Sequence, residues 1–156
     1  MEIEYGILEK KLLDFLDKHK ILVLATAANN RVTARSMSCV HVGLKICFQT
    51  SGISVKYQQI EQNPNVALCD SNMQIQGVAQ IREHPLAETS SAFIGLYKVH
   101  HPGSFKTYSH LRDNVVIEVE PKLVTFWEYD SDGLPYREFL YLPERKAERE
   151  YYDISQ

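Results

Sequence analysis

Alternation of apolar and polar positions recurs along the chain and predicts a protein built mainly from β-strands. Segment 73–81 is the clearest case, because Met73, Ile75 and Ala79 alternate with three glutamines. An apolar run at 21–27 predicts a strand that is buried on both faces. Further strands are predicted at 33–41, 44–50, 66–69, 115–119 with its continuation at 123–129, and 136–142.

A helical period is confined to a few segments. Leu8, Leu12 and Phe15 recur at helical spacing among charged residues, which predicts an amphipathic N-terminal helix. Pro85 suits the first turn of a second helix, which should end at His100–Gly103. A short helical piece is also predicted at 104–111. The charged C-terminal segment at 143–156 is expected to form a surface helix or a tail.

Six or seven short strands with few helices predict a small antiparallel barrel with helices across its ends. Periodicity alone does not separate this barrel from a sandwich. The length of 156 residues and the absence of repeats or linkers predict one domain that spans residues 1–156.

Charge and hydrophobicity limit the partners and the cellular compartment that we expect for the protein. A net charge of −3 gives no electrostatic reason to expect a nucleic-acid partner. No apolar run has the length of a membrane helix and the N-terminus lacks the order of a signal peptide, so we expect a cytoplasmic protein without a membrane partner.

The cysteines predict neither a disulfide framework nor a metal site. Cys39, Cys47 and Cys69 are odd in number, lack C-x-x-C spacing and fall in predicted strands, which favours buried reduced thiols. Reactive-thiol chemistry at Cys39 is the less favoured alternative. Adjacent histidines such as His100 and His101 more often end a helix in solvent than bind haem or metal.

The stretch from Arg35 to Pro64 carries the candidate chemistry. It reads as two strands, a glycine turn and a short helix whose start is capped by Ser54. Free amides at the helix start, the hydroxyls of Thr50 and Ser54, and the cations Arg35 and Lys56 would together surround a phosphate. His41 shares the strand face of Arg35 and is a further candidate.

These residues resemble the pyridoxamine 5'-phosphate oxidase family of FMN-binding split β-barrels. The resemblance rests on R-S-M at 35–37, on Gln49 to Pro64, and on Phe126-Trp127 followed by R-E-F-L-Y at 137–141. It implies a six- to seven-stranded antiparallel split barrel rather than a sandwich. It also implies a homodimer with FMN at the subunit interface.

The resemblance assigns roles to individual residues. Arg35 and Lys56 match phosphate-binding cations, and Thr50 and Ser54 match phosphate-side hydroxyls. Trp127 matches a flavin-proximal aromatic contributed by the partner subunit. The remaining cofactor-binding candidates are Ser36, Met37 and Ser38 along the flavin ring, Gln49 before Thr50, Asn72 (with Gln74 as the lesser alternative) at the ring edge, and Arg137 near Trp127.

Departures from the family pattern limit the expected activity. Leu134, Pro135 and Tyr136 stand where true pyridoxamine phosphate oxidases carry an R-x-H segment, and Val55 replaces a second basic residue. Vitamin oxidation is therefore disfavoured, while FMN binding is retained. The expectation is an FMN-dependent oxidoreductase with hydride transfer at flavin N5 and a small-molecule substrate. The alternative is a non-catalytic flavin- or haem-binding protein on the same barrel.

Overall fold

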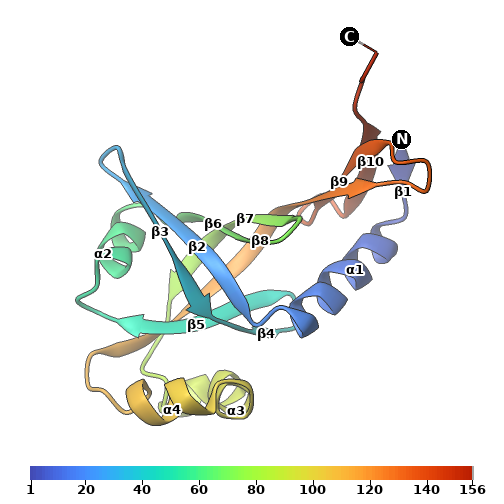
Figure 1. Ribbon diagram of the computed structural model, residues 1–156. Coiled ribbons are helices and arrows are strands. Elements are labelled where there is room, and N and C mark those ends of the chain that lie inside the picture. Colours follow the sequence, from blue (N-terminus) through green and yellow to red (C-terminus); the bar gives the residue numbers. More distant parts are fainter. Residues whose placement is uncertain (156) are drawn as a thin grey trace.

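The computed structural model describes residues 1–155, which form a mostly antiparallel β structure with flanking helices (Figure 1). In chain order the elements are β1 (Glu2–Ile3), α1 (Tyr5–Lys18), β2 (Ile21–Ala28), β3 (Arg31–Ser38), β4 (Val40–Val42), β5 (Lys45–Ser51), α2 (Val55–Gln62), β6 (Asn65–Asp70), β7 (Met73–Ile81), a 3-10 turn (Glu88–Ser90), α3 (Ser91–His100), α4 (Pro102–Tyr108), β8 (Asn114–Tyr129), β9 (Pro135–Tyr141) and β10 (Lys146–Tyr151).

The strands make one sheet that curls without closing. Its order is β1-β10-β9-β8-β7-β6-β2-β3, and β4 and β5 branch from the first half of β8. Every strand pair is antiparallel. The sheet is therefore a split β-barrel, as expected, with more strands than the six or seven anticipated.

Strand β8 continues past Pro121 through a bulge, because Lys122 has no partner on β7. The register of β7 and β8 shifts between Gln76 and Gly77, so Gly77 lies opposite Pro121. A Cβ atom on Gly77 would lie 2.7 Å from Cγ1 of Val119 and 2.8 Å from the carbonyl oxygen of Glu120. Only glycine fits this bulge without a shift of its neighbours.

The apolar faces of the strands and of α1 meet in one main core. Helix α1 buries Leu8, Leu12 and Leu16, which confirms its predicted amphipathic pattern. A smaller cluster around Phe93 and Tyr97 packs α3 against β4 and β5. No helix within residues 1–155 has the length and apolar character needed to cross a membrane.

The C-terminal segment was predicted wrongly as a surface helix or tail. Residues Lys146–Tyr151 form β10, which pairs with β9 and β1. Ala147 is buried opposite Leu140, and Arg149 and Glu150 form ion pairs with Glu138 and Arg137 of β9. A single alanine is a weak apolar signal among so many charges, and the pattern therefore concealed a strand.

Strand β2 is buried on one face only. Leu22, Leu24 and Thr26 are buried, whereas Ile21 and Val23 are exposed on the outer face. The prediction of a strand buried on both faces is thus wrong for the single chain.

Two local predictions also change. Pro85 precedes the 3-10 turn and does not begin a helix, whereas Pro102 occupies the first turn of α4. Cys39 falls between β3 and β4, and Cys69 is exposed, so burial holds for Cys39 and Cys47 alone of the three.

Candidate functional site

The turn between β5 and α2 is built around hydroxyl groups. Ser54 has extended backbone angles, and its Oγ accepts a hydrogen bond from the Tyr57 amide at 3.2 Å, which confirms the predicted cap. Thr50 Oγ1 lies 3.1 Å from Ser54 Oγ. The amide of Gly52 donates to the carbonyl of Asp113 at 2.7 Å and anchors the turn to the start of β8. The helix therefore presents its first-turn amides beside two hydroxyls.

Two cations lie at this turn without a carboxylate partner. Within residues 1–155, no Asp or Glu forms an ion pair with Arg35 or Lys56. Arg35 donates to the carbonyl of Leu24 and to the hydroxyls of Thr26 and Thr33, which hold its side chain over β2 and β3. Partial burial lowers the pKa of Lys56, and the charge of Arg35 lowers it further. Burial also lowers the pKa of Arg35. A bound anion would relieve this repulsion.

A cavity of about 530 Å³ opens beside these groups. The structure brings seven predicted residues to its wall, namely Ser36, Met37, Ser38, Gln49, Thr50, Ser54 and Lys56. Arg35 does not line the cavity, although its charge acts on Lys56 at the edge. The sequence prediction therefore identified most of one wall.

Helices α3 and α4 supply the opposite wall, which sequence reasoning missed. Tyr97 of α3 and Ser104 and Tyr108 of α4 line it, together with Asn114 at the start of β8. Burial raises the pKa of Tyr97, while the polar side chains of Ser104, Gln49 and Ser38 near its hydroxyl oppose the rise. The helical spacing of Phe93 and Tyr97 predicted an apolar helix face. It did not predict which residues lie near the Tyr97 hydroxyl.

Gln49 joins the two walls and retains one unused donor. Ser109 Oγ donates to its Oε1 at 2.9 Å. Its Nε2 is buried and has no hydrogen-bond partner. A buried amide donor without an acceptor is uncommon in native proteins and is consistent with a polar ligand nearby.

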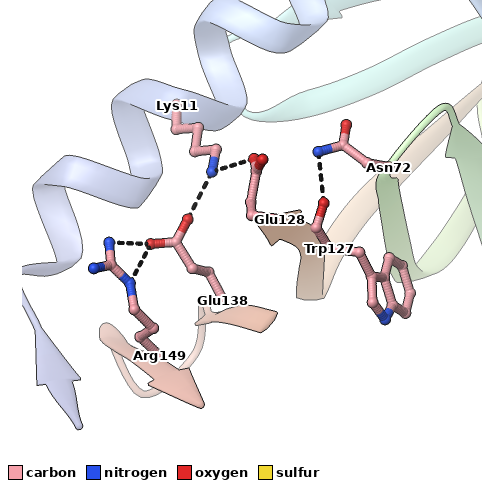
Figure 2. A network of polar contacts seen from close by, with 6 residues as sticks. All are labelled: Lys11, Asn72, Trp127, Glu128, Glu138 and Arg149. Carbon is pink, nitrogen blue, oxygen red and sulfur yellow. Dashed lines mark hydrogen bonds and ion pairs between the residues drawn. The ribbon is translucent and has the colours of Figure 1, made fainter. Parts of the chain in front are cut away.

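Asn72, Trp127 and Arg137 do not join this cavity in the single chain. They lie where β7, β8 and β9 extend away from α2 (Figure 1). Asn72 Nδ2 donates to the carbonyl of Trp127 at 2.9 Å, as Figure 2 shows, and the Trp127 amide donates back to the Asn72 carbonyl. Arg137 pairs with Glu150 at 2.8 Å. The structure thus gathers the candidates into two separate groups.

The histidine candidates are engaged elsewhere or exposed. His41 contacts the carbonyl of Gly43 and the carboxylate of Asp17, away from the cavity. His101 is buried with Nε2 2.8 Å from the carbonyl of Cys39, and His100 is exposed. Residues 1–155 contain no group of three or more His, Cys, Asp or Glu side chains arranged to hold a metal.

The buried thiols are not set up for nucleophilic chemistry. Burial raises the pKa of Cys39 to about 12 and that of Cys47 to about 12. Both therefore remain protonated near neutral pH, which weighs against the alternative of a reactive Cys39.

Comparison of the sequence with known proteins identifies one family. The sequence model of the Pyridoxamine 5'-phosphate oxidase family matches residues 8–128. General stress protein 26 of Bacillus subtilis (strain 168) is 42% identical over 59 residues, which are 38% of this chain and 42% of that protein. The alignment thus spans less than half of that relative.

Solved structures share the fold. A putative pyridoxamine 5'-phosphate oxidase from Listeria innocua superposes with a TM-score of 0.60 and 25% identity over 75% of this chain and 95% of that one. A pyridoxamine 5'-phosphate oxidase-related, FMN-binding protein from Nostoc punctiforme PCC 73102 has a TM-score of 0.62 and 15% identity over 95% of this chain and 94% of that one. At 15% identity the second likeness concerns the fold alone.

Proposed function

The chain belongs to the pyridoxamine 5'-phosphate oxidase family, and from this we propose that it is an FMN-dependent oxidoreductase acting on a small molecule. FMN would supply hydride chemistry at its N5 atom. The protein would bind the cofactor, orient it and shape the space beside it.

One observation carries the proposal: Arg35 and Lys56 lie close enough to repel each other and have no carboxylate partner within residues 1–155. Holding like charges together in a partly buried site is costly unless an anion neutralises them. The Thr50 hydroxyl and the first turn of α2 add donors suited to a phosphate, while the Ser54 hydroxyl beside them donates to the carbonyl of Ser51 at 2.9 Å in the unliganded protein. These residues fit the phosphate end of FMN.

The rest of the cavity suits the neutral part of the same cofactor. Serine hydroxyls of β3, the amide of Gln49 and the hydroxyls of α3 and α4 offer hydrogen bonds without charge. The unused Nε2 donor of Gln49 would meet an acceptor there. No carboxylate or imidazole lines the cavity, so its titratable side chains are Lys56, Tyr97 and Tyr108, and the proposal assigns the lining to binding and orienting the cofactor.

We further propose a homodimer in which each cavity is completed by Asn72, Trp127 and Arg137 of the other subunit. This accounts for two groups of candidate residues that do not meet in one chain. The outer face of β2 and β3 supports the proposal, because it exposes Ile21, Val23 and Val32. A groove of about 540 Å³ continues this apolar face across β6 and β7. Exposed apolar area of this kind is typical of subunit contacts.

A flavin-binding protein without catalysis is the second candidate. The lack of a carboxylate or imidazole in the cavity lining favours it as much as it favours an enzyme that relies on the flavin alone. Haem has less support, because His101 already contacts the carbonyl of Cys39 and no histidine lines the cavity.

Absorbance spectroscopy of the purified protein separates these functions. An oxidoreductase should carry or take up FMN, lose the flavin absorbance with NAD(P)H under anaerobic conditions, and regain it with an acceptor. A bound flavin that responds to neither reagent would identify the non-catalytic binder. Failure to bind FMN in a direct titration would refute both, and a Soret band would point to haem.

A further inference from the structure

Alternating residues of three neighbouring strands place Trp127 and Arg137 together on one face of the sheet. Trp127 of β8 lies opposite Arg137 of β9, which lies opposite Glu150 of β10. The preceding row, formed by Phe126, Glu138 and Arg149, therefore points to the other face.

The other face is fixed by a buried ion cluster. Glu138 is 3% exposed, and its carboxylate accepts from Lys11 of α1 at 2.6 Å and from Arg149 at 2.8 Å. Burial alone would raise the pKa of Glu138, but the hydrogen bonds from these two cations hold it below its usual value. Figure 2 shows this cluster between α1 and the strands, with the indole of Trp127 directed away from it. The backbone that carries Trp127 is thus held firmly.

The Trp127 side chain depends on a different contact. The indole is 40% exposed, and its Nε1 donates to the hydroxyl of Tyr152 at 3.1 Å. Tyr152 is itself anchored, because its amide donates to the carbonyl of Pro135 at 3.1 Å. The Asn72 bonds involve only the backbone of Trp127 and leave its ring free to turn.

The same tyrosine also holds the guanidinium of Arg137, whose Cζ lies 4.8 Å from the centre of the Tyr152 ring. Glu150 accepts from its terminal nitrogen, and Phe139 lies on another side at 5.2 Å. One residue after the last strand thus contacts both side chains of the pair.

We propose that Tyr152 is a positioning residue, which fixes the Trp127 indole and the Arg137 guanidinium in the orientation that they present to FMN in the partner subunit. The part of this inference that concerns FMN rests on the proposed function. Tyr152 lies beyond residues 8–128, the span of the family match.

Two tyrosine-to-phenylalanine variants test the proposal with a matched control. Tyr152→Phe removes the hydroxyl that accepts from Trp127 and keeps the ring against Arg137. Tyr151→Phe makes the same change one residue earlier, where the ring packs on Tyr136 and the side chain is exposed to a similar extent (45% against 41%). Trp127 is the only tryptophan, so intrinsic tryptophan fluorescence reports this residue alone.

The first readout is acrylamide quenching of Trp127 in the protein without flavin. Tyr152→Phe should raise the quenching constant about twofold, because the indole loses its hydrogen bond and becomes mobile, while Tyr151→Phe should match the parent protein. Equal quenching in all three proteins would overturn the proposal.

The second readout is FMN titration, in which Tyr152→Phe should weaken binding about three- to tenfold and Tyr151→Phe should not, as expected for the loss of one neutral hydrogen bond. If the parent binds FMN and Tyr152→Phe binds it equally well, the role at the flavin is refuted. If the parent binds no FMN, the proposed function fails, and the quenching result alone decides whether Tyr152 positions the pair.

Discussion

At the scale of single residues, Lys56 on the cavity wall and Arg35 close to it carry charges that no carboxylate compensates within residues 1–155. Neither has an acidic partner within residues 1–155, and their mutual repulsion lowers the pKa of Lys56 in addition to burial. In an unliganded protein this arrangement costs stability, and a bound phosphate would recover it.

Replacement of Lys56 should therefore weaken FMN binding without harming the fold. We expect Lys56→Gln to weaken binding by about 1.5 to 3 kcal/mol, the range for hydrogen bonds to a charged group. The unliganded variant should be as stable as the parent, because the repulsion from Arg35 is removed.

Fluorescence titration of FMN measures the affinity and urea unfolding measures the stability. Lys10→Gln is the control, since Lys10 is an exposed lysine paired with Asp14 on α1. Equal affinity of Lys56→Gln and the parent would remove Lys56 from the phosphate site.

Residue-level prediction from sequence succeeded where the function of a side chain is local. Ser54 caps α2 as its position in the sequence indicates, and Thr50 lies beside it. It failed for Tyr97, whose hydroxyl reaches Ser38 and Gln49 on strands that lie far earlier in the chain. Thr50 lines the cavity of the single chain and Trp127 does not. A meeting of the two therefore stays a prediction that depends on the proposed dimer.

At the scale of elements, strand register decides where the sheet bends. The bulge opposite Gly77 lets β7 follow β8 past Pro121, and the predicted strand 115–119 and its predicted continuation at 123–129 form one long strand. Proline normally interrupts pairing, and the compensating glycine lies on a different strand. Similarly, β10 is apolar at Ala147 only, and its pairing with β9 had no clear local signal.

A glycine comparison tests the bulge. Gly77→Ala should destabilise the protein by about 1 to 3 kcal/mol, because the added methyl group would overlap Val119 and the backbone of Glu120. Gly95→Ala on α3 introduces the same atom where no other atom lies within 4 Å, and alanine favours a helix. That variant should be neutral or more stable by about 0.5 to 1 kcal/mol. Urea unfolding measures both, and a Gly77→Ala protein as stable as the parent would show that β7 can shift to accept a methyl group.

At the scale of the whole molecule, the sheet leaves an apolar face uncovered. Sequence analysis identified β2 as apolar on both sides but could not tell what covers its second side. In the single chain, nothing within residues 1–155 buries Ile21 or Val32. A second subunit packed on this face would bury the second side of β2, as the sequence predicted.

A charge on this face should separate the proposed dimer. Val32→Asp should give monomers and weaken FMN binding at least tenfold, because each cavity would lose the partner's Trp127 and Arg137. Val99→Asp on α3 is the control, since Val99 is 68% exposed and Val32 is 70% exposed. Light scattering coupled to gel filtration gives the mass. A parent protein that is monomeric at all concentrations would refute the dimer.

Strand β8 carries Asn114, which lines the cavity of its own subunit, at one end. Trp127 lies near the other end, about 43 Å away along an extended chain. In the proposed dimer one subunit would therefore share in two cofactor sites. A subunit defective at Lys56 and a subunit defective at Trp127 should then complement each other when mixed. In a dimer of one subunit of each kind, one site would contain both substitutions and the other site would contain neither. Each hybrid dimer would therefore bind flavin at one of its two sites, although neither variant alone binds it well.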